Sequence, residues 1–192
     1  TPCGTLFPYT TLFRSLKYKL TSDADIEAFL QKELPFSVCG TYGGNTPCVE
    51  IRSGNDLVIC DAGSGIRDFG TDLVRKSQEA GESIPSTFHI FISHLHWDHI
   101  QGFPFFPQAF VSGNRIRIYG YHDNMEKVIR FQQNAVNFPV SVSEMQADID
   151  FIVLEPDRRY KINGFNVKAI RQNHPGASYG FSFEKEGKKI VY

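Results

Sequence analysis

Runs of apolar residues predict an interleaved series of strands and helices along most of the chain. Strands are expected at residues 46–52, 56–60, 88–93, 115–119, 149–154, 166–171, 179–184 and 189–192. Helices are expected where apolar side chains recur every three or four residues, at 23–33, 66–80 and 124–133. Strands interleaved with helices are typical of α/β proteins, in which sheets are buried beneath layers of helices.

Turn and cap residues set several of these boundaries. Ser22 or Asp23 is suited to cap the first helix, and Gly81 to end the second, because glycine adopts the left-handed conformation common just past a helix. The sequence Ser53-Gly54-Asn55 separates two strand runs and predicts a hairpin.

The strand predicted at 88–93 leads into a dense cluster of metal-binding side chains, because residues 94–99 have the sequence His-Leu-His-Trp-Asp-His. Alternate side chains of extended backbone share a face, so His94, His96 and Asp98 are expected to converge, whereas His99 must reach the site through a turn. Imidazole and carboxylate suit zinc, and also manganese or iron(II). The alternative, histidines of a polar surface loop, requires a chance match of probability about 3 in 10,000.

With Gly102 three residues further on, this hexapeptide resembles the signature of the metallo-β-lactamase-fold hydrolases. The resemblance extends to residues 42–50, to Asp-Ala-Gly-Ser-Gly at 61–65 and to Asn-His-Pro-Gly at 173–176, and so covers about residues 38–192. It implies an αββα sandwich, of which this chain would hold the N-terminal half and the start of the second half.

The resemblance also implies a centre for two metal ions. Its ligands would be His94, His96 and His174 for one metal, and Asp98 and His99 for the other. Two zinc ions per complete domain are expected, with manganese or iron as alternatives, and a metal-bound hydroxide as nucleophile. Asp98 is the expected catalytic residue, which orients the nucleophile or relays its proton. In the family, a bridging Asp and a final His complete the second site, and both would lie beyond Tyr192.

Other polar residues near these motifs have two interpretations. Asp61 either accepts a ligand imidazole's N–H group or caps the following turn. Asn45 and Thr46 either line the pocket or belong to an ordinary turn, and the turn is preferred for both. His89 and His122 are expected not to bind metal.

Apolar side chains near the motifs are expected mainly in the core. For the aromatic group that includes and follows the hexapeptide, core packing is preferred over a wall of the pocket. This group comprises Trp97, Phe103, Phe105 and Phe106. Small core residues are also the preferred interpretation of Cys39, Cys48 and Cys60.

Composition limits the class of protein, its binding partners and its location. The 192 residues are 41% hydrophobic and 21% charged, which is ordinary for a globular domain. The net charge of −1 and the lack of a basic run predict no nucleic-acid-binding patch, and no apolar run is long enough to cross a membrane. The four cysteines form no CxxC pair, which favours a reducing, cytoplasmic location.

The two ends of the chain are unusual. Thr5 to Ser15 look like an in-frame translation of a common sequencing adapter, so residues 1–15 are expected to be an artefactual arm, with a genuine N-terminal arm as the alternative. Residues 16–192 would then form one metallo-β-lactamase-like domain. Because the chain stops within a strand-like run, this domain is expected to be truncated at its C-terminus.

Among the functions of the family, a dinuclear hydrolase fits best, because His96 disfavours the flavodiiron branch and His99 disfavours the zinc β-lactamases. The segments 43–46 and 102–104 favour phosphodiesterases of the cyclic-phosphate and tRNA 3′-end types, with a small-molecule or nucleotide-type substrate. A glyoxalase-II-like thioesterase is the alternative enzyme. With half its second site missing, the fragment is expected to be inactive alone, and a non-catalytic metal-binding role is an alternative of another class.

Overall fold

The computed structural model describes residues 20–33, 44–81 and 83–192 of the chain. The described residues fall into two units, divided between Gly44 and Asn45. The predicted arm at 1–15 and Cys39 lie outside the described residues, so the proposed domain boundary after residue 15 stays a prediction.

The first unit contains helix α2 (Asp23–Lys32), which begins at a capping box. The Ser22 side chain accepts a hydrogen bond from the backbone N–H of Asp25, at 3.2 Å, and the Asp25 carboxylate accepts one from the backbone N–H of Ser22, at 3.0 Å. Two N–H groups that the helix leaves without internal partners are thereby satisfied. The predicted helix and its N-cap are confirmed.

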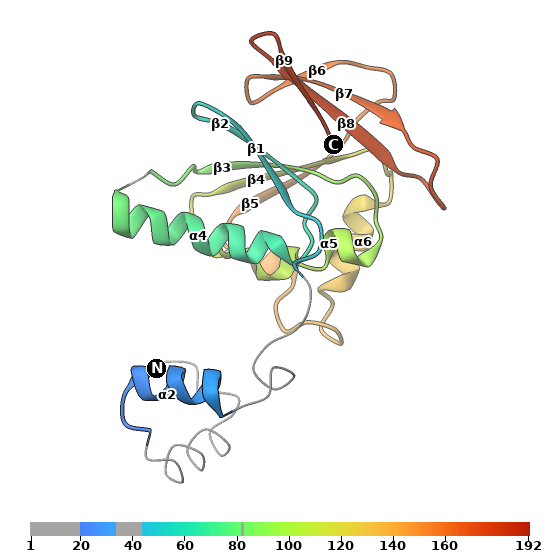
Figure 1. The fold of residues 1–192 in the computed structure, drawn as a ribbon. Helices are drawn as coiled ribbons and strands as arrows, with labels where there is room; N and C mark the ends of the chain where they lie inside the picture. The colour runs from blue at the N-terminus through green and yellow to red at the C-terminus, as the bar shows by residue number, and fades with distance from the viewer. Residues whose placement is uncertain (1–19, 34–43, 82) are drawn as a thin grey trace. The chain divides into compact units, whose positions relative to one another are not determined.

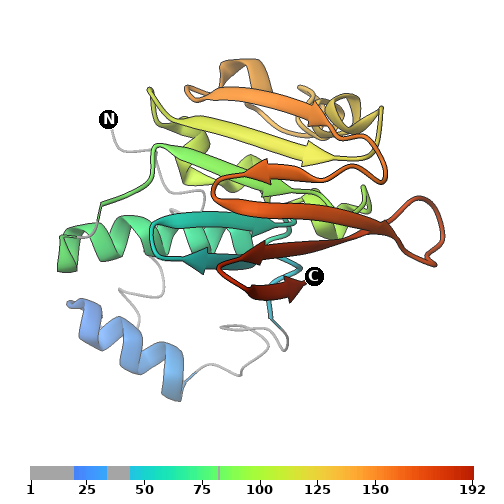
Figure 2. The same ribbon diagram turned by 90° about the horizontal axis from the view of Figure 1, so that it is seen from above.

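The second unit is built on two sheets (Figures 1 and 2). The first has the order β1 (Val49–Ser53), β2 (Asp56–Cys60), β3 (Thr87–Phe91), β4 (Arg115–Gly120) and β5 (Asp148–Val153). The second has the order β6 (Tyr160–Ile162), β7 (Phe165–Arg171), β8 (Tyr179–Lys185) and β9 (Lys188–Val191). Strands β2 to β5 are parallel, whereas the β1–β2 hairpin and the second sheet are antiparallel. All predicted strands are present, and only the three-residue β6 was missed.

Helices lie against one face of the first sheet, and the second sheet lies against the other (Figure 1). The helical layer contains α4 (Gly65–Ala80), α5 (Trp97–Ile100) and α6 (Met125–Gln132), with the 3-10 turns η1 (Phe103–Phe105), η2 (Pro107–Phe110) and η3 (Val142–Glu144). Both predicted long helices are confirmed, and Gly81 ends α4 with a left-handed φ of 67°.

Strand alternation divides the apolar side chains between two cores. Ile59 and Ile90 face the helices, whereas their neighbours Cys60 and Phe91 face the second sheet. Residues 160–191 contribute only strands, so the described chain supplies three layers, helix, sheet and sheet, of the predicted αββα sandwich. The predicted α/β fold, with the N-terminal half and the start of the second half, is confirmed.

Cys48 and Cys60 are free thiols, with Cys60 buried and Cys48 half-buried against the core. Burial raises the pKa of Cys48 to about 12 and that of Cys60 well above its ordinary value, so both remain protonated and unreactive. The expectation that these two are core residues is confirmed, while the cytoplasmic location inferred from cysteine usage stays a prediction.

No helix among the described residues has both the length and the apolar character needed to span a membrane.

Two backbone hydrogen bonds join α5 and the residue that follows its C-cap to the loop after β2. The N–H of Ala62 donates to the carbonyl of His99, and the N–H of Gly102 donates to the carbonyl of Ala62, each at 2.8 Å. The two backbones approach so closely that a Cβ atom on Gly102 would overlap the carbonyl oxygen of Gly63. Glycine is required at residue 102 by this contact.

Replacing Gly102 by alanine is therefore expected to destabilise the chain by about 1–3 kcal/mol, the usual cost of overpacking. Urea denaturation measures the change. Gly44→Ala is the matched control, because a Cβ atom there has nothing within 4 Å. Equal midpoints for the two variants would contradict the close approach.

Candidate metal centre

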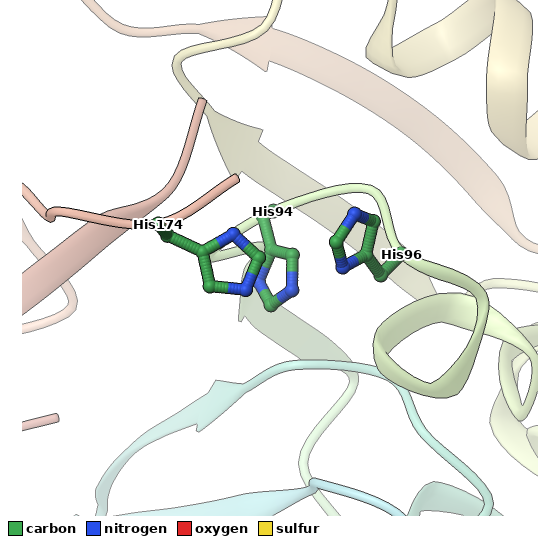
Figure 3. A group of neighbouring side chains, drawn as sticks. All are labelled: His94, His96 and His174. Carbon is green, nitrogen blue, oxygen red and sulfur yellow. The ribbon is translucent and has the colours of Figure 1, made fainter. Parts of the chain in front are cut away.

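Two loops at the same edge of the sandwich bring three imidazoles together. His94 and His96 lie on the loop that joins β3 to α5, and His174 lies on the loop between β7 and β8. Figure 3 shows the three rings facing a common space. Each offers a ring nitrogen, and these nitrogens lie within 4.8 Å of one another. Three nitrogen ligands and an open fourth position are the arrangement of a catalytic zinc site.

Hydrogen bonds orient two of these rings for metal binding. The Nδ1 atom of His174 lies 2.8 Å from the carbonyl oxygen of Pro175. A carbonyl can only accept, so Nδ1 carries the proton and Nε2 keeps a free lone pair. The Nδ1 atom of His94 lies 3.0 Å from Ser93 Oγ, whose own proton is donated to Asp61. His94 must therefore donate from Nδ1 as well, which leaves its Nε2 free.

The surroundings keep His94 neutral. Burial, together with the nearby His99, His174 and His96 rings, lowers the pKa of His94 to about 4. A neutral imidazole is the form that binds metal, so protons compete weakly at this ligand. His96 is exposed and His174 is half-buried, so the space between the rings is open to solvent on their side.

Asp98 and His99 form a second, smaller group beside the first. The His99 ring centroid lies 3.9 Å from that of His94, and His99 Nε2 lies 3.4 Å from an Asp98 carboxylate oxygen. Because α5 begins at Trp97, Asp98 is helical and exposed. The alternation argument therefore holds for His94 and His96 and is wrong for Asp98. The assignment of all five residues as ligands stays a prediction.

Asp61 is the buried anchor of this region. Its backbone has a left-handed φ of 61°, a conformation uncommon outside glycine. One carboxylate oxygen accepts from the N–H of Ser93 at 2.7 Å, and the other lies 2.7 Å from Ser93 Oγ, 2.6 Å from His99 Nδ1 and 2.7 Å from the Tyr192 hydroxyl. The bond to Asp61 raises the pKa of His99. These contacts match the first interpretation of Asp61, an acceptor for a ligand imidazole.

Sequence reasoning missed Ser93 and Tyr192, although both contact Asp61. Serine and tyrosine are too common to signal such a role, and Tyr192 lies 131 residues from Asp61 along the chain. His89 lies instead beside the Tyr119 hydroxyl at 3.0 Å, and His122 donates to the Ala177 carbonyl at 2.8 Å, so neither joins the three-imidazole cluster.

The preferred turn interpretation of Asn45 and Thr46 describes only part of their role. Thr46 Oγ1 accepts from the N–H of Ser64 at 2.6 Å and from the Gln101 amide at 3.1 Å. Asn45 donates to Asp68 at 2.7 Å and also lines a surface hollow. Both residues thus tie the segment before β1 to α4 and α5.

Comparisons with known proteins identify related sequences. Residues 57–192 match the family model described as "Beta-lactamase superfamily domain". Ribonuclease Z of Picrophilus torridus is 25% identical over 155 residues, which cover 78% of this chain and 44% of that protein. Ribonuclease Z of Staphylococcus saprophyticus is 28% identical over 137 residues, which cover 68% of this chain and 40% of that protein. The chain thus spans less than half the length of these two relatives.

The fold also matches a solved structure. The metallo-beta-lactamase fold protein YhfI from Bacillus subtilis superposes with a TM-score of 0.52 at 19% identity. The match covers 79% of this chain and 56% of YhfI. At this identity the likeness bears on the fold alone.

The chain is expected to hold one zinc ion tightly, because one three-imidazole group is present among the described residues. His96→Ala should remove most of this binding, since two protein ligands rarely retain zinc against a chelator. The zinc content per chain after dialysis is measured for the unaltered chain and for His96→Ala. His89→Gln is the control outside the cluster. Two tightly held equivalents per chain would contradict the prediction.

Loss of the Asp61 carboxylate should weaken zinc binding about 10- to 100-fold, the usual effect of removing a partner that orients a ligand. In Asp61→Asn, a neutral amide replaces the carboxylate on which the three side-chain donors converge. Competition with a chelator measures the zinc affinity of this variant. Asp56→Asn is the control, since Asp56 pairs with Lys185 away from the centre. An unchanged affinity in a folded Asp61→Asn protein would show that the carboxylate does not act on the ligands.

Proposed function

Because this chain belongs to the beta-lactamase superfamily, we propose that it carries the metal-binding part of a metal-dependent hydrolase that cleaves phosphodiester bonds. The observation that carries the proposal is the cluster of His94, His96 and His174, with Asp98 and His99 directly beside it. Such neighbouring sites suit the cleavage of phosphodiesters, in which both the attacking and the leaving oxygen need stabilisation.

The three-imidazole cluster fits zinc, with manganese or iron as alternatives, because neutral nitrogen ligands suit all three metals. A zinc ion held there supplies Lewis acidity, which lowers the pKa of water and stabilises negative charge on phosphate. The bonds at Nδ1 of His94 and of His174 select, for each neutral ring, the tautomer whose lone pair lies on Nε2. Asp98 is exposed beside His99 and is the carboxylate available to hold or move a proton.

The proposed substrate is a phosphodiester of RNA. The similarity to two proteins named ribonuclease Z supports this choice over the thioester of a glyoxalase-II-like enzyme. Within the small-molecule or nucleotide-type substrates that the sequence predicts, the same similarity favours RNA.

A non-catalytic metal-binding role is the second candidate, and one observation favours it. Among the described residues only His94, His96 and His174 form a group of three metal ligands, so Asp98 and His99 would need further ligands for a second ion. The two candidates differ in whether a longer gene product turns over substrate.

The 192-residue chain loaded with zinc is expected to show no measurable hydrolysis of bis(p-nitrophenyl) phosphate, because the residues that the structure describes supply no second group of three ligands. If the gene continues beyond Tyr192, as the resemblance implies, its longer product should hydrolyse this ester with zinc or manganese, and Asp98→Ala should abolish the turnover. Asp148→Ala, at the exposed first residue of β5, is the matched control. Turnover by the 192-residue chain that Asp98→Ala abolishes would contradict the first expectation. Cleavage of S-lactoylglutathione alone by the longer product would favour the thioesterase.

A further inference from the structure

Two large aromatic side chains near the metal centre are exposed. Trp97 is 71% exposed and Phe105 is 53% exposed, whereas Phe103 and Phe106 are fully buried. The expectation of core packing is therefore correct for Phe103 and Phe106 and wrong for Trp97 and Phe105. Burying such a ring contributes about 1.5–3 kcal/mol, so two neighbouring exposed rings forgo a large stabilisation. Exposed apolar groups of this kind mark binding surfaces.

The two exposed rings separate adjoining hollows. Hollows of about 410 and 550 Å³ are both lined by Trp97, Gln101 and Phe105. The first is also lined by Asn45 and by the start of α4, which lies beside α5 (Figure 1). Volumes of this size are typical of sites for small ligands. Hereafter the first hollow, lined by Asn45, Ser64, Arg67, Asp68, Trp97, Gln101, Gly102 and Phe105, is called the aromatic trough.

The aromatic trough includes a residue of the segment that carries predicted metal ligands. Trp97 lies between His96 and Asp98 and is the first residue of α5, so its indole ring is attached to the same short segment as two predicted ligands. Around α5, Asp98 lies between Trp97 and His99, so a group bound on this ring is separated from a phosphate held at the metal by the face that carries Asp98. In a polynucleotide, the group next to a phosphate is a nucleoside, whose base offers a flat aromatic face.

One wall of the trough offers a free positive charge. Arg67 is exposed and forms no ion pair among the described residues. The neighbouring carboxylate of Asp68 is instead bound by the Asn45 amide at 2.7 Å. A guanidinium without a carboxylate partner is suited to bind a phosphate through paired N–H groups. The trough therefore combines a stacking surface with an anion-binding group.

We propose that the aromatic trough binds the nucleotide next to the scissile phosphodiester, with its base stacked on Trp97 and Phe105 and its outer phosphate bound by Arg67. This inference rests on the proposed function and names the subsite that would hold the RNA substrate. Bases of every kind have a π-face, so the trough selects nucleotides without selecting a sequence. It also supplies affinity for RNA without an extended basic patch.

The chain contains a single tryptophan, so its fluorescence reports on Trp97 directly. The zinc-loaded 192-residue chain is titrated with AMP and, in parallel, with ribose 5-phosphate, which lacks the base. Saturable quenching is expected with AMP, at least about fivefold tighter than any response to ribose 5-phosphate, the lower limit for one base stacked on an aromatic ring. Equal responses to the two ligands, or no quenching by AMP, would overturn the proposal.

Matched variants test each wall of the trough. Phe105→Leu should weaken AMP binding about fivefold or more through lost stacking, whereas Phe131→Leu, at a phenylalanine 68% exposed on α6, should not. Arg67→Gln should weaken binding of adenosine 3′,5′-bisphosphate, which carries a phosphate for each place, about 3- to 30-fold, whereas Arg75→Gln removes the same charge further along α4 and should leave it unchanged. Equal effects of a variant and its control would reject that wall's role.

The titration needs no turnover, so it separates the trough from the proposed function. A longer gene product that hydrolyses phosphodiesters but shows no AMP quenching would reject the trough alone. Base-dependent quenching in a protein that hydrolyses no phosphodiester would support the trough and reject the proposed hydrolase.

Discussion

The buried carboxylate of Asp61 is the interaction on which the metal centre depends. A buried charge is costly unless polar partners surround it, and the partners of Asp61 come from three separate segments. Ser93 follows β3, His99 lies on α5 and Tyr192 follows β9. Satisfying one carboxylate therefore fixes the ends of both sheets and the start of α5 relative to each other.

The same carboxylate sets the direction of the hydrogen bonds in the centre. Because it can only accept, Ser93 Oγ and His99 Nδ1 must donate to it, and His94 must then donate to Ser93. In the neutral form of each ring, Nε2 of His94 and Nε2 of His99 thus carry the lone pair, one from each predicted ligand group. The Asp61 bond raises the pKa of His99, which makes its Nε2 a stronger ligand, whereas burial and the nearby imidazole rings lower that of His94.

Most of the fold could be predicted because its strands and helices bury regular faces. Runs of apolar residues located β2, β3 and β4, and Gly81 located the end of α4, since each signal is local. The three residues of β6 are too few for a pattern. The contact of Tyr192 with Asp61 could not be predicted, because it joins residues 131 positions apart. The start of α5 at Trp97 was also missed, and extended geometry was therefore assigned to Asp98.

The position of α5 accounts for both the metal ligands and the exposed tryptophan. Backbone hydrogen bonds at Ala62 hold this short helix with His99 directed at Asp61 and Ile100 in the core. Successive helical residues are about 100° apart, so Trp97 lies roughly 200° from His99, on the opposite side of the helix. The constraint that directs His99 inward thus directs Trp97 outward. A ligand on one side of α5 and a stacking surface on the other follow from the same buried contact.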